Sequence, residues 1–224
     1  MKREVISVKE QEANSPGRKA TLVAIIGGSG AGKSYLAGLL QKKLGTKATR
    51  LAVDDFYRDR SACSPARRDQ INFDHPRALD WAELEHVLTQ LASGQAAAVP
   101  QYDFTTHTRR PARRFVEASP VVLVEGLWPC HRRSVRALFD MSIFLDCPEE
   151  TRLLRRLQRD VPQRGRSPES VRHQFFQTVS PMHHKFVRPQ MQWSDLVMRK
   201  PVMAREVAQL ARKIECLDKV YGGI

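Results

Sequence analysis

The sequence has few cysteines and no long apolar run. Its four cysteines show neither a C-x-x-C pair nor the spacing of a zinc site, so they predict no disulfide framework and no structural metal. No apolar stretch approaches the ~18 residues of a transmembrane helix, and we find no apolar core of a signal peptide. These absences favour a protein of a reducing, cytoplasmic compartment that makes no membrane contact.

The sequence is also short of acidic residues. Only 24 Asp and Glu stand against 37 Lys and Arg, which gives a formal net charge of +13. Such a balance can indicate nucleic-acid binding. The arginines, however, are concentrated in residues 109–114, 132–136 and 152–166, and enzymes that handle phosphate groups need arginine as well. We therefore expect no nucleic-acid partner.

The chain length fits one domain with inserted segments, given that domains average about 150 residues. Residues 1–20 are polar and charged, and we interpret them as an N-terminal tail; residues 21–224 form the predicted domain. Apolar runs at residues 21–26, 49–53, 121–124, 141–145 and 196–198 predict strands, and helical periodicity between them indicates the α/β class.

A glycine-rich stretch, G-G-S-G-A-G-K-S, matches the pattern G-x-x-x-x-G-K-[ST] between the first predicted strand and a predicted helix over residues 33–44. Glycines let backbone N–H groups surround phosphates, and the helix N-terminus adds positive potential. A lysine here can reach the outer phosphates, and a serine hydroxyl suits Mg²⁺. The sequence therefore predicts a nucleoside triphosphate bound by nine consecutive residues: Gly27, Gly28, Ser29, Gly30, Ala31, Gly32, Lys33, Ser34 and Tyr35.

Carboxylates follow two of the predicted strands. Asp54 and Asp55 come after residues 49–53, and Glu125 follows residues 121–124. Ligands of open α/β sheets bind outside the carboxyl ends of the strands, so these side chains are expected near the phosphates. Successive side chains of an extended segment point in opposite directions, and only one of the two aspartates can then face an acceptor. An Asx turn that closes the strand is the alternative for Asp54.

Residues 96–118 alternate aromatic and polar side chains around turn-forming threonines, which predicts a small β-hairpin over the site. Tyr102, Phe104 and His107 are its candidate contacts. From the residues alone, a surface hairpin whose rings pack on its own base is the favoured interpretation of His107.

A predicted helix from Pro148 places arginines on one side at i, i+4 and i+7 spacing, with leucines on the other. We expect it to lose periodicity over residues 160–166, which contain Pro162 and Gly165. Arginines beside a glycine hinge suit a lid, residues 152–170, that closes over transferring phosphates. A solvated charged face is the alternative. Beyond the lid we predict a helix interrupted at Pro181 and a last helix over residues 201–217.

Seven motifs along residues 22–198 resemble, in this order, those of the uridine kinase (uridine–cytidine kinase) family of P-loop kinases: G-G-S-G-A-G-K-S, D-D-F-Y-R, N-F-D-H-P, Q-Y-D-F-T-T-H-T-R, V-E-G-L, R-D-V-P-Q-R-G-R and V-S-P-M-H-H-K-F-V-R-P. The resemblance implies a three-layer α/β/α fold around a five-stranded parallel sheet. It also implies ATP and Mg²⁺ as cofactors, and a homo-oligomer.

The resemblance assigns roles to single residues. Asp54 falls on the carboxylate that activates the ribose 5′-hydroxyl, Asp74 on the one that holds the ribose hydroxyls, and Glu125, with Ser34, on the magnesium-associated positions. Lys33, Asp54, Arg159 and Arg166 would be the catalytic set. The remaining matches are lid and nucleoside contacts: Tyr57, Tyr102, Phe104, His107, Arg156, Arg164 and Gln174.

Two departures keep alternatives open. Arg199-Lys200-Pro201 stands where the family has a P-R-G-like loop near the donor base, and Trp128 is bulkier than usual after V-E-G-L. An ATP-dependent kinase of the uridine or cytidine 5′-hydroxyl is the first hypothesis. A related kinase of another small alcohol or sugar is the second. A P-loop switch or nucleic-acid-binding NTPase is the third, and the sequence lacks the N-K-x-D motif of a GTPase switch.

Overall fold

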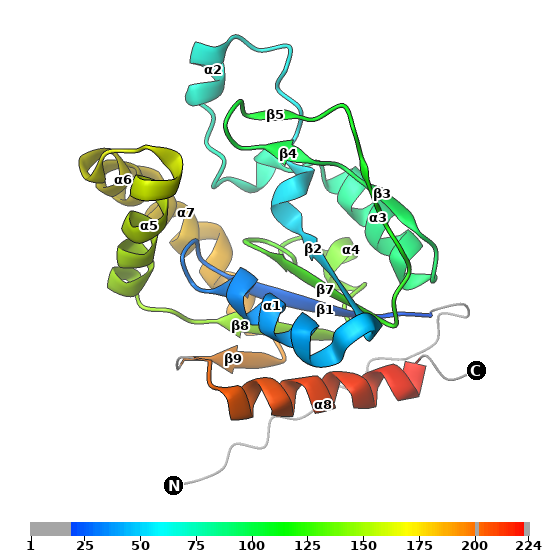
Figure 1. Cartoon of the computed structure of the whole chain (residues 1–224). Helices are drawn as coiled ribbons and strands as arrows, with labels where there is room; N and C mark the ends of the chain where they lie inside the picture. The colour runs from blue at the N-terminus through cyan, green and yellow to red at the C-terminus, as the bar shows by residue number, and fades with distance from the viewer. Residues whose placement is uncertain (1–18, 200–201, 222–224) are drawn as a thin grey trace, which may run out of the picture.

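The computed structural model describes residues 19–199 and 202–221, which are built around a five-stranded parallel sheet (Figure 1). The strand order is β2 (Ala48–Ala52), β7 (Val121–Gly126), β1 (Thr21–Gly27), β8 (Met141–Leu145) and β9 (Leu196–Met198). Every residue of β1, β7 and β8 is buried, because both faces of these central strands are covered. All five predicted strands and their parallel arrangement are confirmed.

Helices cover both faces of the sheet. Helices α1 (Lys33–Leu44) and α8 (Ala204–Tyr221) pack on one face, and α3 (Trp81–Ala92) packs on the other. Alternate residues of β1 supply the two cores: Val23 and Ile25 face α1 and α8, whereas Leu22, Ala24 and Ile26 face α3. The short helix α4 (Arg133–Arg136) follows β7.

The predicted hairpin consists of two short antiparallel pairs. Strand β3 (Ala97–Val99) pairs with β6 (Arg114–Val116), and β4 (Tyr102–Asp103) pairs with β5 (Thr108–Arg109). Arg109 fixes this segment: it donates to Glu83 at 2.5 Å and to the carbonyl oxygens of Tyr57 and Phe56 at 2.7 and 3.3 Å. The hairpin and the short helix α2 (Pro65–Asp69) therefore lie over the carboxyl end of β2 (Figure 1).

Helix α5 (Glu149–Arg164) differs from its prediction. Pro148 is its N-cap rather than its first helical residue, and the helix continues through Pro162 to a left-handed Gly165 with φ 62°. Its polar side faces the protein: Arg152, Arg156 and Asp160 are buried, while Leu154 is 55% exposed. The expected loss of periodicity over residues 160–166 is thus wrong for residues 160–164, which continue the helix with a charged buried side.

The chain from Pro168 onwards is one long helical run. It comprises α6 (Pro168–Gln174), π-helical turns over Phe175–Val179 and His183–Val187 around α7 (Ser180–Met182), and a 3₁₀ turn over Arg188–Trp193. The predicted interruption at Pro181 is wrong, because the π-helical turns beside Pro181 keep the chain helical where a proline lacks an N–H.

The predicted N-terminal tail and the start of the last predicted helix fall partly on residues that the structure does not describe. Ala20 is buried, so the core begins inside the predicted 1–20 tail; residues 1–18 and Pro201 lie outside the described residues. Within residues 19–199 and 202–221, no helix is long and apolar enough to cross a membrane. The four cysteines are free thiols.

Candidate functional site

The glycine-rich loop follows β1 directly and leads into α1, as the sequence predicts. Gly30 and Gly32 have positive φ angles of 82° and 95°, which favour glycine, and Gly32 is the N-cap of α1. A Cβ atom on Gly28 would lie 2.8 Å from both Arg152 Nη1 and His183 Nδ1. The loop is therefore closed in by side chains from α5 and from the helical run after it.

Lys33 lies at the centre of the loop. Its ammonium group donates to the carbonyl oxygen of Gly28 at 3.1 Å. Burial lowers the pKa of Lys33, while the nearby charges of Glu125 and Asp54 oppose that shift. These interactions place the lysine, Asp54 and Glu125 around one point at the carboxyl ends of β1, β2 and β7.

The two aspartates after β2 do not lie in an extended segment. Residues Val53–Phe56 form a 3₁₀ turn, so the expectation of opposite directions from strand alternation is wrong. The turn nevertheless separates them. Asp54 Oδ1 is buried without a hydrogen-bond partner among the described residues, whereas Asp55 lies 3.9 Å from Arg114 of the hairpin.

The pKa of Asp54 is raised to about 6, first by burial and then by the charges of Glu125, Asp74 and Asp55, against the opposing charge of Lys33. A carboxylate with this pKa is ionised at neutral pH but is far more basic than an exposed aspartate. Its unpartnered oxygen can accept a hydrogen bond from a ligand hydroxyl.

The residues at the carboxyl ends of β1, β2 and β7 fit a magnesium ion that would have few protein ligands. Glu125 is 9% exposed at the end of β7, and Ser34 stands in the first turn of α1. Within the described ranges, no group of three or more His, Cys, Asp or Glu side chains could hold a metal. A cation here would therefore take most of its ligands from phosphate and water, as Mg²⁺ commonly does.

Five aromatic side chains pack together near Asp54, and we call Tyr57, Phe73, Tyr102, Phe104 and His107 the aromatic cluster. The Tyr57 hydroxyl donates to the Phe73 carbonyl oxygen at 2.9 Å. Phe73 stacks on His107 with ring centroids 4.5 Å apart, and Tyr57 and Tyr102 are 5.2 Å apart. The hairpin thus brings its predicted residues to residues that follow β2.

His107 and Asp74 have distinct settings within this region. His107 has a left-handed backbone with φ 55°, which turns its ring back onto Phe73. Asp74 follows Phe73 directly; burial raises the pKa of its carboxyl group, while the charges of Arg156 and Lys33 oppose the shift. The predicted acceptor residues therefore gather on one side of the phosphate loop.

Comparison with known proteins decides the family. The family model described as "Phosphoribulokinase / Uridine kinase family" matches residues 22–206. The chain belongs to this family. A uridine kinase of Halobacterium salinarum is 35% identical over 193 residues, covering 86% of each chain. A uridine kinase of Staphylococcus haemolyticus is 38% identical over 179 residues, covering 80% of this chain and 86% of that one.

Solved structures agree on the fold of this family. A putative fructose transport system kinase from Silicibacter sp. TM1040 superimposes with a TM-score of 0.67 at 21% identity, covering 84% of this chain and 93% of that chain. Phosphoribulokinase from Rhodobacter spheroides gives a TM-score of 0.60 at 18% identity, covering 79% and 68%. The resemblance to the uridine kinase family and the P-loop α/β fold are confirmed.

Among the residues matched to this family, the arginines of the predicted lid make hydrogen bonds to the phosphate loop and to Gln174. Arg156 donates from Nη1 to Ser29 Oγ at 2.7 Å and from Nη2 to Gln174 Oε1 at 3.0 Å. Arg166 donates to the same Gln174 oxygen at 2.5 Å. Gln174 is predicted to touch substrate, but here its side-chain oxygen accepts hydrogen bonds from two arginines. The Arg164 guanidinium group lies 5.9 Å from the centre of the Phe104 ring.

Several neighbours of the site were not predicted from the family motifs. Phe73 lies inside N-F-D-H-P and packs on His107, and Arg152 and His183 close in Gly28. Burial, together with the charge of Arg152, lowers the pKa of His183 to about 3, so its ring is neutral. The arginine spacing on α5 was a signal for Arg152; nothing in the sequence distinguishes His183 from His184.

Trp128, the departure from the family pattern, lies behind the aromatic cluster. Its side chain is fully buried in the core, and its ring centroid is 6.5 Å from that of Tyr57. It therefore supports Tyr57 from the core side and presents no exposed surface to a ligand.

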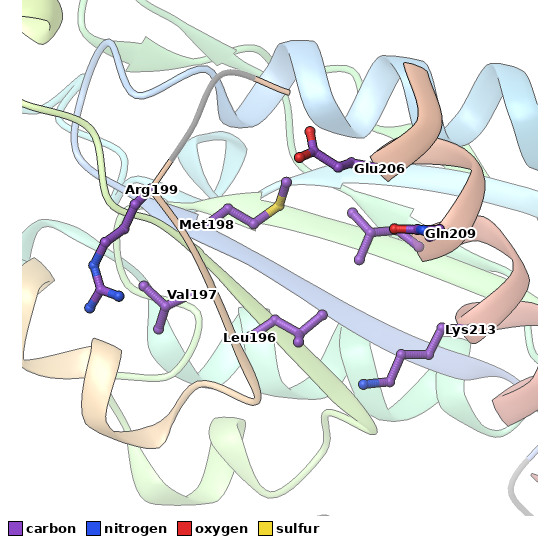
Figure 2. Close-up of a pocket in the computed structure, with 8 residues that line it drawn as sticks. Leu196, Val197, Met198, Arg199, Glu206, Gln209 and Lys213 are labelled. Carbon is purple, nitrogen blue, oxygen red and sulfur yellow. The ribbon is translucent and has the colours of Figure 1, made fainter. Parts of the chain in front are cut away.

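A cavity of about 580 Å³ lies away from the phosphate loop, between β9 and α8 (Figure 2). Leu196 to Arg199 line it from the edge strand, and one face of α8 closes it through Glu206, Gln209, Leu210 and Lys213. No residue of the phosphate loop or the aromatic cluster lines it, so it is separate from the site described above.

Proposed function

We propose that the protein is an ATP-dependent kinase that transfers the γ-phosphoryl group to the 5′-hydroxyl of uridine or cytidine. The setting of Asp54 carries the proposal. This buried carboxylate interacts electrostatically with Lys33 on the phosphate side and with Tyr57 on the aromatic side, and one of its oxygens has no hydrogen-bond partner in the described part of the chain. The similarity of the chain to proteins named uridine kinase supports this choice of acceptor.

On this proposal, Asp54 orients the acceptor hydroxyl and takes its proton late in the transfer. Phosphoryl transfer depends mainly on positioning and on neutralising charge, so the carboxylate serves first to align the hydroxyl with the γ-phosphorus. Lys33 would exchange the Gly28 carbonyl oxygen for the outer phosphate oxygens. Arg159 and Arg166 would stabilise charge on the transferring group. Ser34 and Glu125 would hold Mg²⁺, which neutralises phosphate charge when it is bound.

The aromatic cluster would hold the pyrimidine. Tyr102 carries a buried hydroxyl oxygen without a hydrogen-bond partner in the described chain, and a base edge can supply one. Asp74 would accept hydrogen bonds from the ribose hydroxyls. Pyrimidine rings also suit stacking against the Phe73, Phe104 and Tyr57 rings.

A smaller alcohol or sugar is the second candidate acceptor, and one observation favours it. Phe73 and His107 are stacked at 4.5 Å, and the Tyr57 hydroxyl already bonds to the Phe73 backbone. A base that enters between these rings must separate them, whereas a small acceptor beside Asp54 leaves them stacked.

The remaining parts of the proposal concern the setting of the enzyme. We propose a cytoplasmic enzyme that forms a homo-oligomer, has a hairpin over its acceptor and a lid over residues 152–170, and has no nucleic-acid partner. The free thiols of all four cysteines suit a reducing compartment.

The decisive experiment measures phosphoryl transfer from Mg–ATP and Mg–GTP to a panel of nucleosides, sugars and small alcohols. We expect Mg–ATP with uridine or cytidine to give the highest kcat/KM, with the phosphate on the 5′-oxygen by NMR. The Asp54→Asn protein, purified in the same way, controls for contaminating kinases. Transfer to a sugar or simple alcohol but to no pyrimidine nucleoside would replace the first acceptor by the second.

A further inference from the structure

Asp160 is the only acidic residue of residues 151–168, and its side chain is fully buried among arginines. Arg159 donates from Nε to Asp160 Oδ1 at 2.7 Å, and Arg164 Nη1 lies 3.5 Å from the same oxygen. Arg156 Nη2 lies 3.4 Å from Oδ2. Burial alone would raise the pKa of Asp160, but the Arg159 hydrogen bond and the arginine charges hold it below its ordinary value, so the carboxylate is charged.

The backbone of Asp160 also fixes the end of the lid helix. Its carbonyl oxygen accepts the N–H of Gly165, and it accepts the N–H of Arg166 at 3.3 Å. One residue therefore holds three arginine side chains with its carboxylate and the following turn with its carbonyl group.

The arginines held by Asp160 reach both halves of the site. Arg156 donates to Ser29 of the phosphate loop, and Arg164 lies near Phe104 of the aromatic cluster. The charge of Arg159 acts on Lys33, and the charge of Arg164 interacts with that of Asp54. Without an anion between them, three neighbouring guanidinium groups repel one another. Arg159 and Arg164 are 39% and 44% exposed and can turn to solvent.

We infer that Asp160 is a positioning residue, which holds Arg156, Arg159 and Arg164 where phosphoryl transfer needs them without touching substrate itself. The inference rests on the proposed function, because it assumes that these arginines act on the transferring phosphoryl group. It has an unusual consequence. Removing the carboxylate charge makes the site more positive, so triphosphate binding should persist or strengthen while transfer slows.

The test compares the Asp160→Asn protein with a matched control, Glu169→Gln. Glu169 is an exposed residue in the first turn of α6, so its replacement removes the same charge from the same region. We expect Asp160→Asn to lower kcat at least about tenfold, as for a lost transition-state contact, with an equal or lower Kd for Mg–ATP. Glu169→Gln should stay within about twofold of wild type in both quantities.

A double-mutant cycle with Arg159→Ala gives a second readout. If Asp160 acts through Arg159, the arginine substitution should slow wild type strongly and the Asp160→Asn protein only slightly. If the effects of the two substitutions on kcat multiply, as they do for independent residues, the inference is overturned. An Asp160→Asn protein that fails to fold, or that loses Mg–ATP affinity together with kcat, would overturn it too, since the residue would then be structural.

The proposed function and this inference can fail separately. Every comparison is a ratio between variants, and it can be made with whichever acceptor the wild-type protein phosphorylates. If the wild type uses another alcohol, the proposed acceptor fails while the inference remains under test. If the wild type phosphorylates uridine and Asp160→Asn does so equally fast, only the inference fails.

Discussion

Replacing Asp54 by Asn should stabilise the protein while disabling it. The folded structure raises the pKa of this carboxyl group from its ordinary value of 3.8 to about 6, mainly through burial. A shift of about 2 units, at about 1.4 kcal/mol per unit, means that folding loses about 3 kcal/mol when the group is ionised. Asn cannot ionise, and this loss disappears.

The attraction to Lys33 already acts against this shift, so the loss of about 3 kcal/mol includes it and is an upper value for the gain. We therefore expect a net stabilisation of about 1–3 kcal/mol at pH 8. The pKa is raised on folding, so the cost of ionisation is absent below about pH 4, grows towards pH 6 and is complete above it. The advantage of Asp54→Asn should follow the same course.

Thermal unfolding at pH 8 and at pH 4.5, in matched buffers, measures this difference. One kcal/mol corresponds to about 2–4 °C in Tm for a chain of this size. Single-turnover transfer in the same preparations should fall by about 10²–10⁴-fold, the usual worth of a positioned base. A stability difference that is absent at pH 8, or equal at both pH values, would refute the argument from burial.

Asp55→Asn is the matched control, because Asp55 is the adjacent residue and its carboxylate faces Arg114 of the hairpin. We expect it to keep transfer. An inactive Asp55→Asn protein beside an active Asp54→Asn protein would move the proposed base by one residue.

Three further changes test the rest of the site. Lys33→Ala should abolish transfer and raise the Kd of Mg–ATP at least about tenfold, since it removes the charge on the outer phosphates; unchanged turnover would reject the phosphate loop as the donor site. Arg166→Ala should lower kcat more than it raises the KM of the nucleoside, as steady-state kinetics will show, and an intact kcat would leave this arginine as a solvated charge. Gly28→Ala should weaken Mg–ATP binding at least about tenfold by calorimetry, because a Cβ atom would lie 2.8 Å from Arg152 and His183; wild-type affinity would mean that these side chains yield.

The sheet and the phosphate loop could be predicted from the sequence because their signals are local. Buried parallel strands read as short apolar runs, and the helix over residues 33–44 has the predicted bounds, with Gly45 after its last turn. The position of the strand-end carboxylates near the phosphate loop follows from the parallel arrangement alone, because the carboxyl ends of all the strands lie at one edge of the sheet.

The parts that failed depend on contacts between distant residues. Pro162 normally ends a helix, yet here the Asp160 carbonyl oxygen accepts the N–H of Gly165 and the Asp160 carboxylate lies 3.5 Å from Arg164. Phe73 and His107 are 34 positions apart, and only the folded hairpin stacks them. Alternation could not place Asp54 either, because the chain leaves the strand and tightens into a 3₁₀ turn at Val53. The predicted roles of the individual site residues remain predictions.

The inverted packing of α5 has a consequence for the heat capacity of binding. This helix buries arginines and leaves Leu154 in solvent, so movement of the predicted lid would exchange mainly polar surface with water. Polar and apolar surface change heat capacity with opposite signs, and apolar burial gives the familiar negative value. Lid closure on Mg–ATP should therefore have a heat-capacity change near zero or positive, whereas an acceptor that enters the aromatic cluster should give a negative one. Titration calorimetry at several temperatures would then distinguish the two ligands by the surface that each removes from water.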